Sequence, residues 1–272
     1  MIGLLRADWR KLRHRWMPRV LILILLALVA LIFFAVSRRA RFQADLPLPN
    51  GFIVALSLAA AFAPFIWPVL AGSWAGGEYS WGTMRITLTR LPSRMAFTLS
   101  GLLMVLLTVV VGLVLVLVVG AIAGSIVGAA NHVASSTSPA GSSASQVIIK
   151  LFLAACFTSS FYAVLAYTAG VIFRSVPAGV GIGIGFSVAQ SATLAVFTAL
   201  GDPWKSLALH LPDAYSESLT SRLASELVVN GPFARVSSTA SSIQDAIIGL
   251  AVYVVVLLAI MPTLVRVRDI SV

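Results

Sequence analysis

Charged residues are scarce in this chain of 272 amino acids. Only 10% of the residues are Asp, Glu, Lys or Arg, whereas a typical soluble domain contains about 25%. Apolar residues make up 59% of the chain, and the mean hydropathy is +1.00. So few polar groups cannot cover a surface exposed to water. The composition therefore excludes a water-soluble enzyme and indicates a protein that uses lipid as part of its solvent.

Cysteine and histidine are also rare, and this limits the possible active sites. Cys156 is the single cysteine, which excludes an internal disulfide framework and a multi-cysteine metal site. The three histidines, His14, His132 and His210, lie in three separate segments and do not suggest a zinc or haem site. A nucleotide-binding P-loop and a Gly-x-Ser-x-Gly elbow are both missing. We therefore expect no catalytic residue, no metal and no cofactor in this chain.

Six long apolar runs are the main feature of the sequence. Each is far longer than a barrel strand and has no period-2 alternation, so membrane-spanning helices are predicted. The fold class is an all-α integral membrane protein, with residues 1–272 forming one transmembrane domain. The first run is longer than the apolar centre of a signal peptide and is interpreted as an uncleaved span. The spans are predicted at about residues 20–36, 52–74, 96–126, 147–173, 176–200 and 243–265.

The positive charges predict an orientation in the membrane. The net charge is +10, and with the amino terminus inside, twelve Lys and Arg residues lie in inner segments and seven in outer ones. This distribution predicts a multi-pass protein of the cell (inner) membrane with both termini in the cytoplasm. Three arginines would lie outside, against the positive-inside rule: Arg38, Arg39 and Arg41. Because the charges fall between apolar runs, contact with anionic lipids is a better explanation than binding of nucleic acid.

The spans offer few polar groups for transport. We expect no ionisable side chain deep in any of them, which argues against a proton-coupled transporter or an ion pump. Gln190 is the only amide in a span and suits either an interhelical hydrogen bond or a contact with substrate. Span 52–74 carries Pro64 and Pro68 among aromatic residues, as in a kinked helix that lines a passage or in ordinary packing. The candidate passage residues are Phe62, Phe65, Trp67 and Gln190.

Small residues recur at helical spacing in two of the spans. Glycine occupies positions 179, 181, 183 and 185 in one span, and positions 120, 124 and 128 at the end of another. Such stripes allow helices to approach closely, although a flexible gate is an alternative. Close packing is the prediction for both spans.

The segments outside the predicted spans contain two amphipathic patterns. Within residues 1–17, apolar residues recur every three or four positions opposite a cationic face, which predicts a helix on the inner leaflet that turns into the first span at Pro18. The residues expected at the lipid interface are Trp9, Arg10, Arg13 and Trp16. In the outer loop 201–242, Tyr215, Leu219, Leu223 and Leu227 predict a helix near 213–229 that rests on the bundle or on the outer leaflet.

The inner loop 76–95 is the most informative segment. It has room for one short helix, on which Trp81, Met84 and Leu88 form an apolar edge next to arginines. This pattern suits a protein-binding surface or, alternatively, a loop that only contributes positive charge. The loop also contains Glu-x-x-x-Gly-Thr-x-Arg-x-x-Leu-x-x-x-Pro-x-x-Arg. The matching residues are Glu78, Gly82, Thr83, Arg85, Leu88, Pro92 and Arg94.

This motif, its place between the second and third spans, the six spans and the amino-terminal helix together resemble the ABC-2-type permeases. These are the membrane subunits of six-span, type V-like ATP-driven exporters. The resemblance implies an exporter permease in which loop 76–95 forms a coupling helix on a separate cytosolic ATPase, which binds ATP and Mg. The implied coupling residues are Glu78, Tyr79, Trp81, Gly82, Thr83, Met84, Arg85 and Leu88. Gly76-Gly77 before Glu78 departs from the usual pattern and suggests an early end or a hinge in the second span.

The resemblance also implies the partners. A second permease subunit, the same chain or a related one, would form a dimer with this chain, and cargo would pass at their interface. The amino-terminal helix would be the elbow helix of the family. The apolar spans favour an amphipathic or lipid-like cargo. The alternative is a subunit that transports nothing and anchors or assembles a larger membrane complex.

Overall fold

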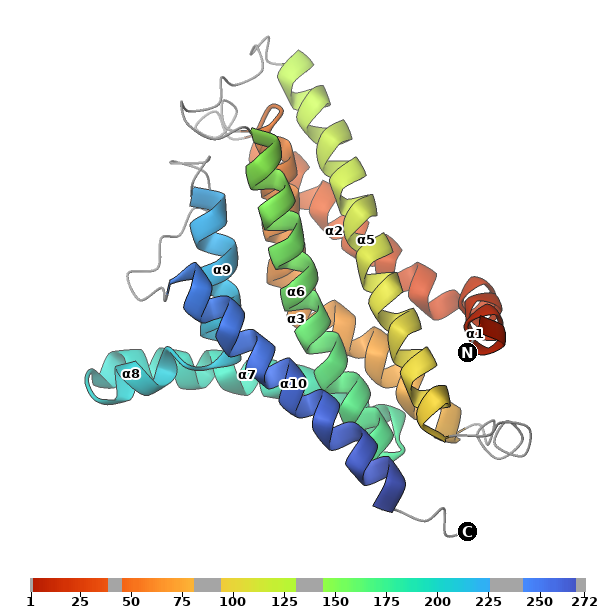
Figure 1. The fold of residues 1–272 in the computed structure, drawn as a ribbon. Helices are drawn as coiled ribbons and strands as arrows, with labels where there is room; N and C mark the ends of the chain where they lie inside the picture. The colour runs from red at the N-terminus through yellow and green to blue at the C-terminus, as the bar shows by residue number, and fades with distance from the viewer. Residues whose placement is uncertain (1, 39–45, 81–93, 131–143, 226–241, 268–272) are drawn as a thin grey trace.

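A computed structural model describes residues 2–38, 46–80, 94–130, 144–225 and 242–267 of the chain. Regular structure within these ranges is helical and contains no strand. The helices in Figure 1 are α1 (Ile2–His14), α2 (Trp16–Ser37), α3 (Asn50–Ser80), α5 (Arg94–Ala130), α6 (Ala144–Phe173), α7 (Val176–Leu200), α8 (Trp204–Ala208), α9 (Pro212–Ser225) and α10 (Ile243–Val267).

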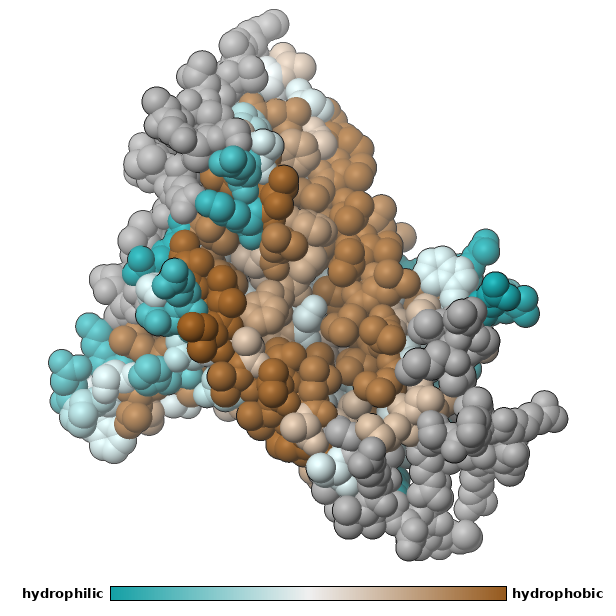
Figure 2. All heavy atoms as spheres, viewed as in Figure 1, coloured by the Kyte–Doolittle hydropathy of each residue, from teal (hydrophilic) through white to brown (hydrophobic). Residues whose placement is uncertain are grey.

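Six of these helices, α2, α3, α5, α6, α7 and α10, are long and apolar enough to cross a membrane. Figure 2 shows a broad apolar surface over the bundle, with hydrophilic atoms gathered at its margins. The predicted class, an all-α multi-pass membrane protein, is therefore confirmed. Helix α7 begins and ends at the predicted residues, whereas the others extend past their apolar runs. The 37 residues of α5 correspond to about 55 Å, and its upper end projects beyond α6 in Figure 1.

The break between α1 and α2 lies at Arg15, and the predicted turn at Pro18 is wrong. Arg15 has extended backbone angles (φ −77°, ψ 127°), and α2 begins at Trp16. Pro18 is buried in the first turn of α2, where a backbone N–H has no intrahelical partner and its loss costs little. The expected interfacial segment 1–17 is therefore split between two helices.

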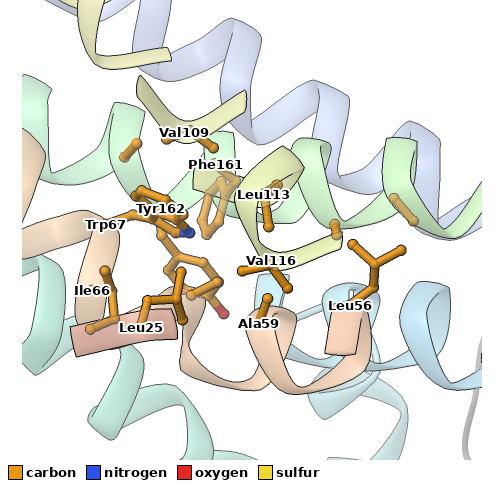
Figure 3. Close-up of a cluster of buried hydrophobic side chains, with 14 of the residues drawn as sticks. Leu25, Leu56, Ala59, Ile66, Trp67, Val109, Leu113, Val116, Phe161 and Tyr162 are labelled. Carbon is orange, nitrogen blue, oxygen red and sulfur yellow. The ribbon is translucent and has the colours of Figure 1, made fainter. Parts of the chain in front are cut away.

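Helix α3 is the centre of the bundle. It contacts α2, α5, α6, α7 and α9. Within its apolar 18-residue stretch, 67% of the residues are buried, whereas the value for α10 is 11%. Its Trp67 is fully buried beside Phe161 and Tyr162 of α6 and Leu113 of α5 (Figure 3). A methyl group on Gly112 would lie 2.7 Å from the Trp67 ring. The small residue on α5 thus makes room for the largest side chain of the core.

The expected weakening of the helix at Gly76-Gly77 is not observed. Helix α3 continues through both glycines to Ser80, and both are buried. A methyl group on Gly76 would collide with the backbone of Ser175 and Val176, where α6 leads into α7. One turn earlier, a methyl on Gly72 would lie 2.6 Å from the Gly179 carbonyl carbon of α7. The glycines therefore allow backbone-to-backbone packing of α3 on α7.

Close packing is confirmed for some of the predicted glycine positions. On α5, added methyl groups on Gly120 and Gly124 would lie within 3.0 Å and 3.3 Å of Gly51 on α3. On α7, in contrast, nothing lies within 4 Å of a methyl placed on Gly181 or Gly185. The prediction of packing is wrong for these two positions within one chain, because glycines two residues apart point to different sides of a helix.

The segment between α7 and α10 contains the predicted amphipathic helix. Helix α9 begins at Pro212, close to the predicted start, and is described up to Ser225. Its residues Tyr215, Leu219 and Leu223 are buried, and α9 contacts α6 and α10. Leu227, the last residue of the predicted stripe, lies outside the described residues. The α9 helix is thus packed into the bundle as an additional core element.

Candidate functional site

A buried carboxylate joins α1 to the end of α3. Glu78 lies in the last turns of α3 and is 5% exposed. Its Oε2 is 2.9 Å from Lys11 Nζ, and its Oε1 is 2.9 Å from Arg15 Nη2. Arg15 can reach Glu78 because the chain leaves the helical path at that residue. The two ion pairs hold α1 beside the point at which the chain enters residues 81–93.

A second carboxylate fastens α1 to α5. Asp8 is 4% exposed, and Ser100 Oγ of α5 donates a hydrogen bond of 2.8 Å to its Oδ2. Burial raises the pKa of the Asp8 carboxyl above its ordinary value, while the hydrogen bond and the Lys11 charge act in the opposite direction. We name Asp8, Lys11, Arg15, Glu78 and Ser100 the Glu78 cluster. Its two carboxylates and two cations balance each other in charge.

Aromatic rings hold the two cations of the cluster from the other side. The Lys11 ammonium lies 5.7 Å from the centroid of the Phe97 ring on α5. The Arg15 guanidinium lies 4.6 Å from the centroid of the Trp74 ring on α3. Both distances are within the range of cation–π attraction. Each cation is therefore attached to both a carboxylate and a ring.

This arrangement is a set of ion pairs and hydrogen bonds between helices. The part of the chain that the structure describes contains no group of three His, Cys, Asp or Glu residues suited to a metal ion. The Glu78 cluster connects α1, α3 and α5, and the Tyr167 hydroxyl of α6 donates a hydrogen bond of 2.8 Å to the Thr98 carbonyl of α5. Four helices are thus tied together at this end of the bundle.

The predicted coupling residues lie only partly within the described structure. Glu78 and the half-buried Tyr79 lie in the last turn of α3. Trp81, Gly82, Thr83, Met84, Arg85 and Leu88 lie outside the described residues, so the coupling helix stays a prediction. Sequence analysis missed the intramolecular partners of Glu78. The available signal was Asp8, a single acid in a strongly basic segment, with Lys11 three residues later on the same side of a helix.

The predicted interfacial residues lie on α1 and at the start of α2, on the side that faces away from the bundle. Arg10 and Arg13 are exposed, as are Trp9 (43%) and Trp16 (79%). They border a surface cavity of about 560 Å³ lined by Trp9, Arg10, Arg13, His14, Trp16 and Arg19. This side of α1 is therefore accessible, while the Glu78 cluster faces the bundle.

The four candidate passage residues do not form a common lining within one chain. Trp67 is fully buried in the core, whereas Phe65 is 46% exposed and Phe62 is half-buried. Gln190 of α7 is buried, and its Oε1 accepts a hydrogen bond of 3.1 Å from the backbone N–H of Asp213. Of the two interpretations of Gln190, the structure shows the hydrogen bond between helices.

Asp213 joins three helices in a second polar cluster that sequence analysis missed. It lies in the first turn of α9 and accepts hydrogen bonds of 2.9 Å from the hydroxyls of Tyr162 on α6 and Ser191 on α7. Asp213 lies outside the spans, in the segment between α7 and α10, so the expectation that no ionisable side chain lies deep in a span does not concern it. Its position follows from the packing of α9 into the bundle, which a sequence pattern does not specify.

Comparisons with protein-family models, with curated proteins and with solved structures found no match to this chain. The features of this chain that bear on its function are the six apolar helices, the Glu78 cluster and the motif that begins at Glu78.

Proposed function

We propose that this chain is the permease subunit of an ATP-binding-cassette exporter of the ABC-2 type. It has no nucleotide site of its own and is driven by a separate cytosolic ATPase that docks on the loop between α3 and α5. The observation that supports this most directly is the position of Glu78. The first residue of the motif is buried and paired with Lys11 and Arg15 at the point where the chain enters that loop.

The Glu78 cluster transmits movement of the docked loop to the membrane helices. The partner ATPase, which holds ATP and Mg, closes when it binds nucleotide and displaces the docked loop. Because the buried Glu78 is paired with Lys11 and Arg15, α1 and α3 follow this displacement together, and the Asp8–Ser100 hydrogen bond extends it to α5. ATP binding changes the populations of two states of the bundle through differential affinity for them. Amphipathic or lipid-like cargo then passes between two permease subunits.

Co-purification is the direct test of this proposal. The tagged chain is recovered from its native membrane, its partners are identified by mass spectrometry, and the complex is reconstituted in liposomes. We expect an ATPase with a P-loop, and we expect Glu78→Ala or Trp81→Ala/Arg85→Ala to release it or to uncouple hydrolysis from export. Asp202→Asn, which removes an exposed acid after α7, is the matched control. Unchanged assembly and unchanged export in both Glu78 and loop variants would refute the assignment.

The orientation has its own test. In a Cys156→Ser background, Arg85→Cys should react with a membrane-impermeant maleimide only when the cytosolic face is accessible. Labelling from the opposite face would exclude docking of a cytosolic ATPase on this loop.

A non-transporting anchor or assembly subunit is the second candidate. It is favoured by the large apolar surfaces of α7 and α10 that no other described helix of the chain covers. Only 17% and 11% of the residues in their apolar 18-residue stretches are buried. Gly181 and Gly185 on α7 have open space around them and could receive a neighbouring helix. Recovery of a stable membrane complex without any ATPase would favour this candidate.

A further inference from the structure

The cations of α1 and of the break that follows it lie on two different sides. Lys11 and Arg15 face the bundle and are paired with Glu78. Arg10 and Arg13 point away from the bundle and are exposed. The break at Arg15 brings the start of α2 beside them, so that Arg19 joins the same surface cavity of about 560 Å³. Figure 1 shows this corner, where α1 turns into α2 at the margin of the bundle.

The cavity is cationic and has no acid of its own. Three guanidinium groups, from Arg10, Arg13 and Arg19, line it together with His14, and none of its lining residues is Asp or Glu. Among the described residues, none of these three arginines forms an ion pair. Asp8, the acid of α1, is on the other side and bonded to Ser100. The uncompensated positive charge therefore attracts anions from outside the chain.

The position of the cavity indicates which anion it would receive. Trp9 and Trp16 stand exposed in its walls, and tryptophan favours the level of the lipid headgroups. The apolar surface of α2 begins directly beyond the cavity. The exposed apolar residues of the first two turns after Trp16 are Met17, Val20, Leu23 and Ile24. An anion in the cavity is thus within reach of hydrocarbon, as a lipid phosphate is.

We propose that the corner between α1 and α2 is a binding site for the phosphate headgroup of an anionic phospholipid. The planar guanidinium groups of Arg10, Arg13 and Arg19 bind the phosphate oxygens in the two-pronged manner that arginine favours. Trp9 and Trp16 contact the glycerol region and the first methylenes. This site is independent of the cargo and of the proposed export function. Because the same helix is joined to Glu78, a bound headgroup steadies α1 from its outer side.

The experiment compares lipid retention by the purified full chain. Detergent-solubilised protein is mixed with phosphatidylglycerol or phosphatidylcholine, and bound lipid is measured by native mass spectrometry. The test variant is Arg10→Gln/Arg13→Gln/Arg19→Gln. Its control, Arg38→Gln/Lys150→Gln/Lys205→Gln, removes the same charge from positions away from the cavity, of which Arg38 and Lys150 are exposed and Lys205 is half-buried. Each cation near an anionic headgroup contributes roughly fivefold, so the test variant should bind phosphatidylglycerol on the order of a hundredfold more weakly.

Further measurements keep the proposal open to refutation. If the triple variant does not fold, Arg13→Gln alone should weaken binding about fivefold, and Arg38→Gln should leave it unchanged. Equal retention of phosphatidylcholine by the natural chain would overturn the proposal, as would undiminished phosphatidylglycerol binding by the folded test variant. Displacement of the lipid by millimolar inorganic phosphate would show a site for free phosphate and would also overturn it.

Discussion

Replacing Glu78 by Gln tests whether the Glu78 cluster holds α1 in place. Gln has nearly the same shape and keeps a hydrogen-bonding oxygen but removes the negative charge. Lys11 and Arg15 would then lose their carboxylate, although both could still bend toward solvent. Their side chains are 33% and 18% exposed in the ion pairs. We therefore expect α1 to detach more often from the bundle.

The magnitude follows from the burial of the ion pairs. Removing one partner of a fully buried ion pair costs about 3–5 kcal/mol. Because Lys11 and Arg15 are partly exposed, the cost here falls to roughly 1–3 kcal/mol. This corresponds to an increase of about 5- to 150-fold in the population with α1 detached. The 13 residues of α1 are too few for a stable isolated helix, so detachment also unfolds it.

Limited trypsin digestion measures this population. The bonds after Arg10 and Arg13 resist cleavage while α1 is helical and docked, and cleavage at low protease follows the fraction that is open. We expect Glu78→Gln to be cleaved there about 5- to 150-fold faster. Asp202→Asn, the exposed-acid control, should be cleaved at the natural rate. An equal cleavage rate in the natural chain and in Glu78→Gln would refute the inference that these ion pairs secure α1.

Two further predictions concern stability. Gly76→Ala would place a methyl group against the α7 backbone and should destabilise the bundle by about 1–3 kcal/mol, whereas Gly181→Ala, in open space, should be neutral or slightly stabilising; thermal unfolding in detergent compares them, and an equal midpoint would contradict the packing. The raised pKa of Asp8 means that its contribution to stability is present below the ordinary carboxyl pKa and is lost as the pH rises through the raised value. Asp8→Asn should therefore lose less stability than the natural chain as the pH rises above the ordinary carboxyl pKa, and parallel stability curves would exclude this effect.

The spans could be predicted because a long apolar run is a property of one continuous segment of the sequence. All six appear where the apolar runs are, and α7 matches its predicted limits. The helix ends were less predictable, since residues beyond the hydrocarbon can continue a helix, as α3 does through Gly77. The break at Arg15 was misplaced because Pro18 is a strong local signal. Tertiary contacts decided the position, since Arg15 is paired with a residue 63 positions away.

Of the residues in the Glu78 cluster, only Glu78 itself could be predicted from the sequence. Glu78 was identified through the motif, but its burial and its partners Lys11 and Arg15 depend on how α1 folds back onto α3. The same limit applies to Asp213, which reaches Tyr162 across 51 positions because α9 inserts into the bundle. In each case a polar group from outside the spans is carried to them by packing. Periodicity within one segment has no information on such pairs.

The contact of Gly72 with Gly179 has a consequence for evolution and for motion. The two backbones are so close that no carbon atom fits between them. Even alanine, the next larger residue, is therefore too large at either position. Any substitution there must be matched by a shift of a whole helix. A rearrangement of the bundle that keeps this contact moves α3 and α7 together as one rigid pair.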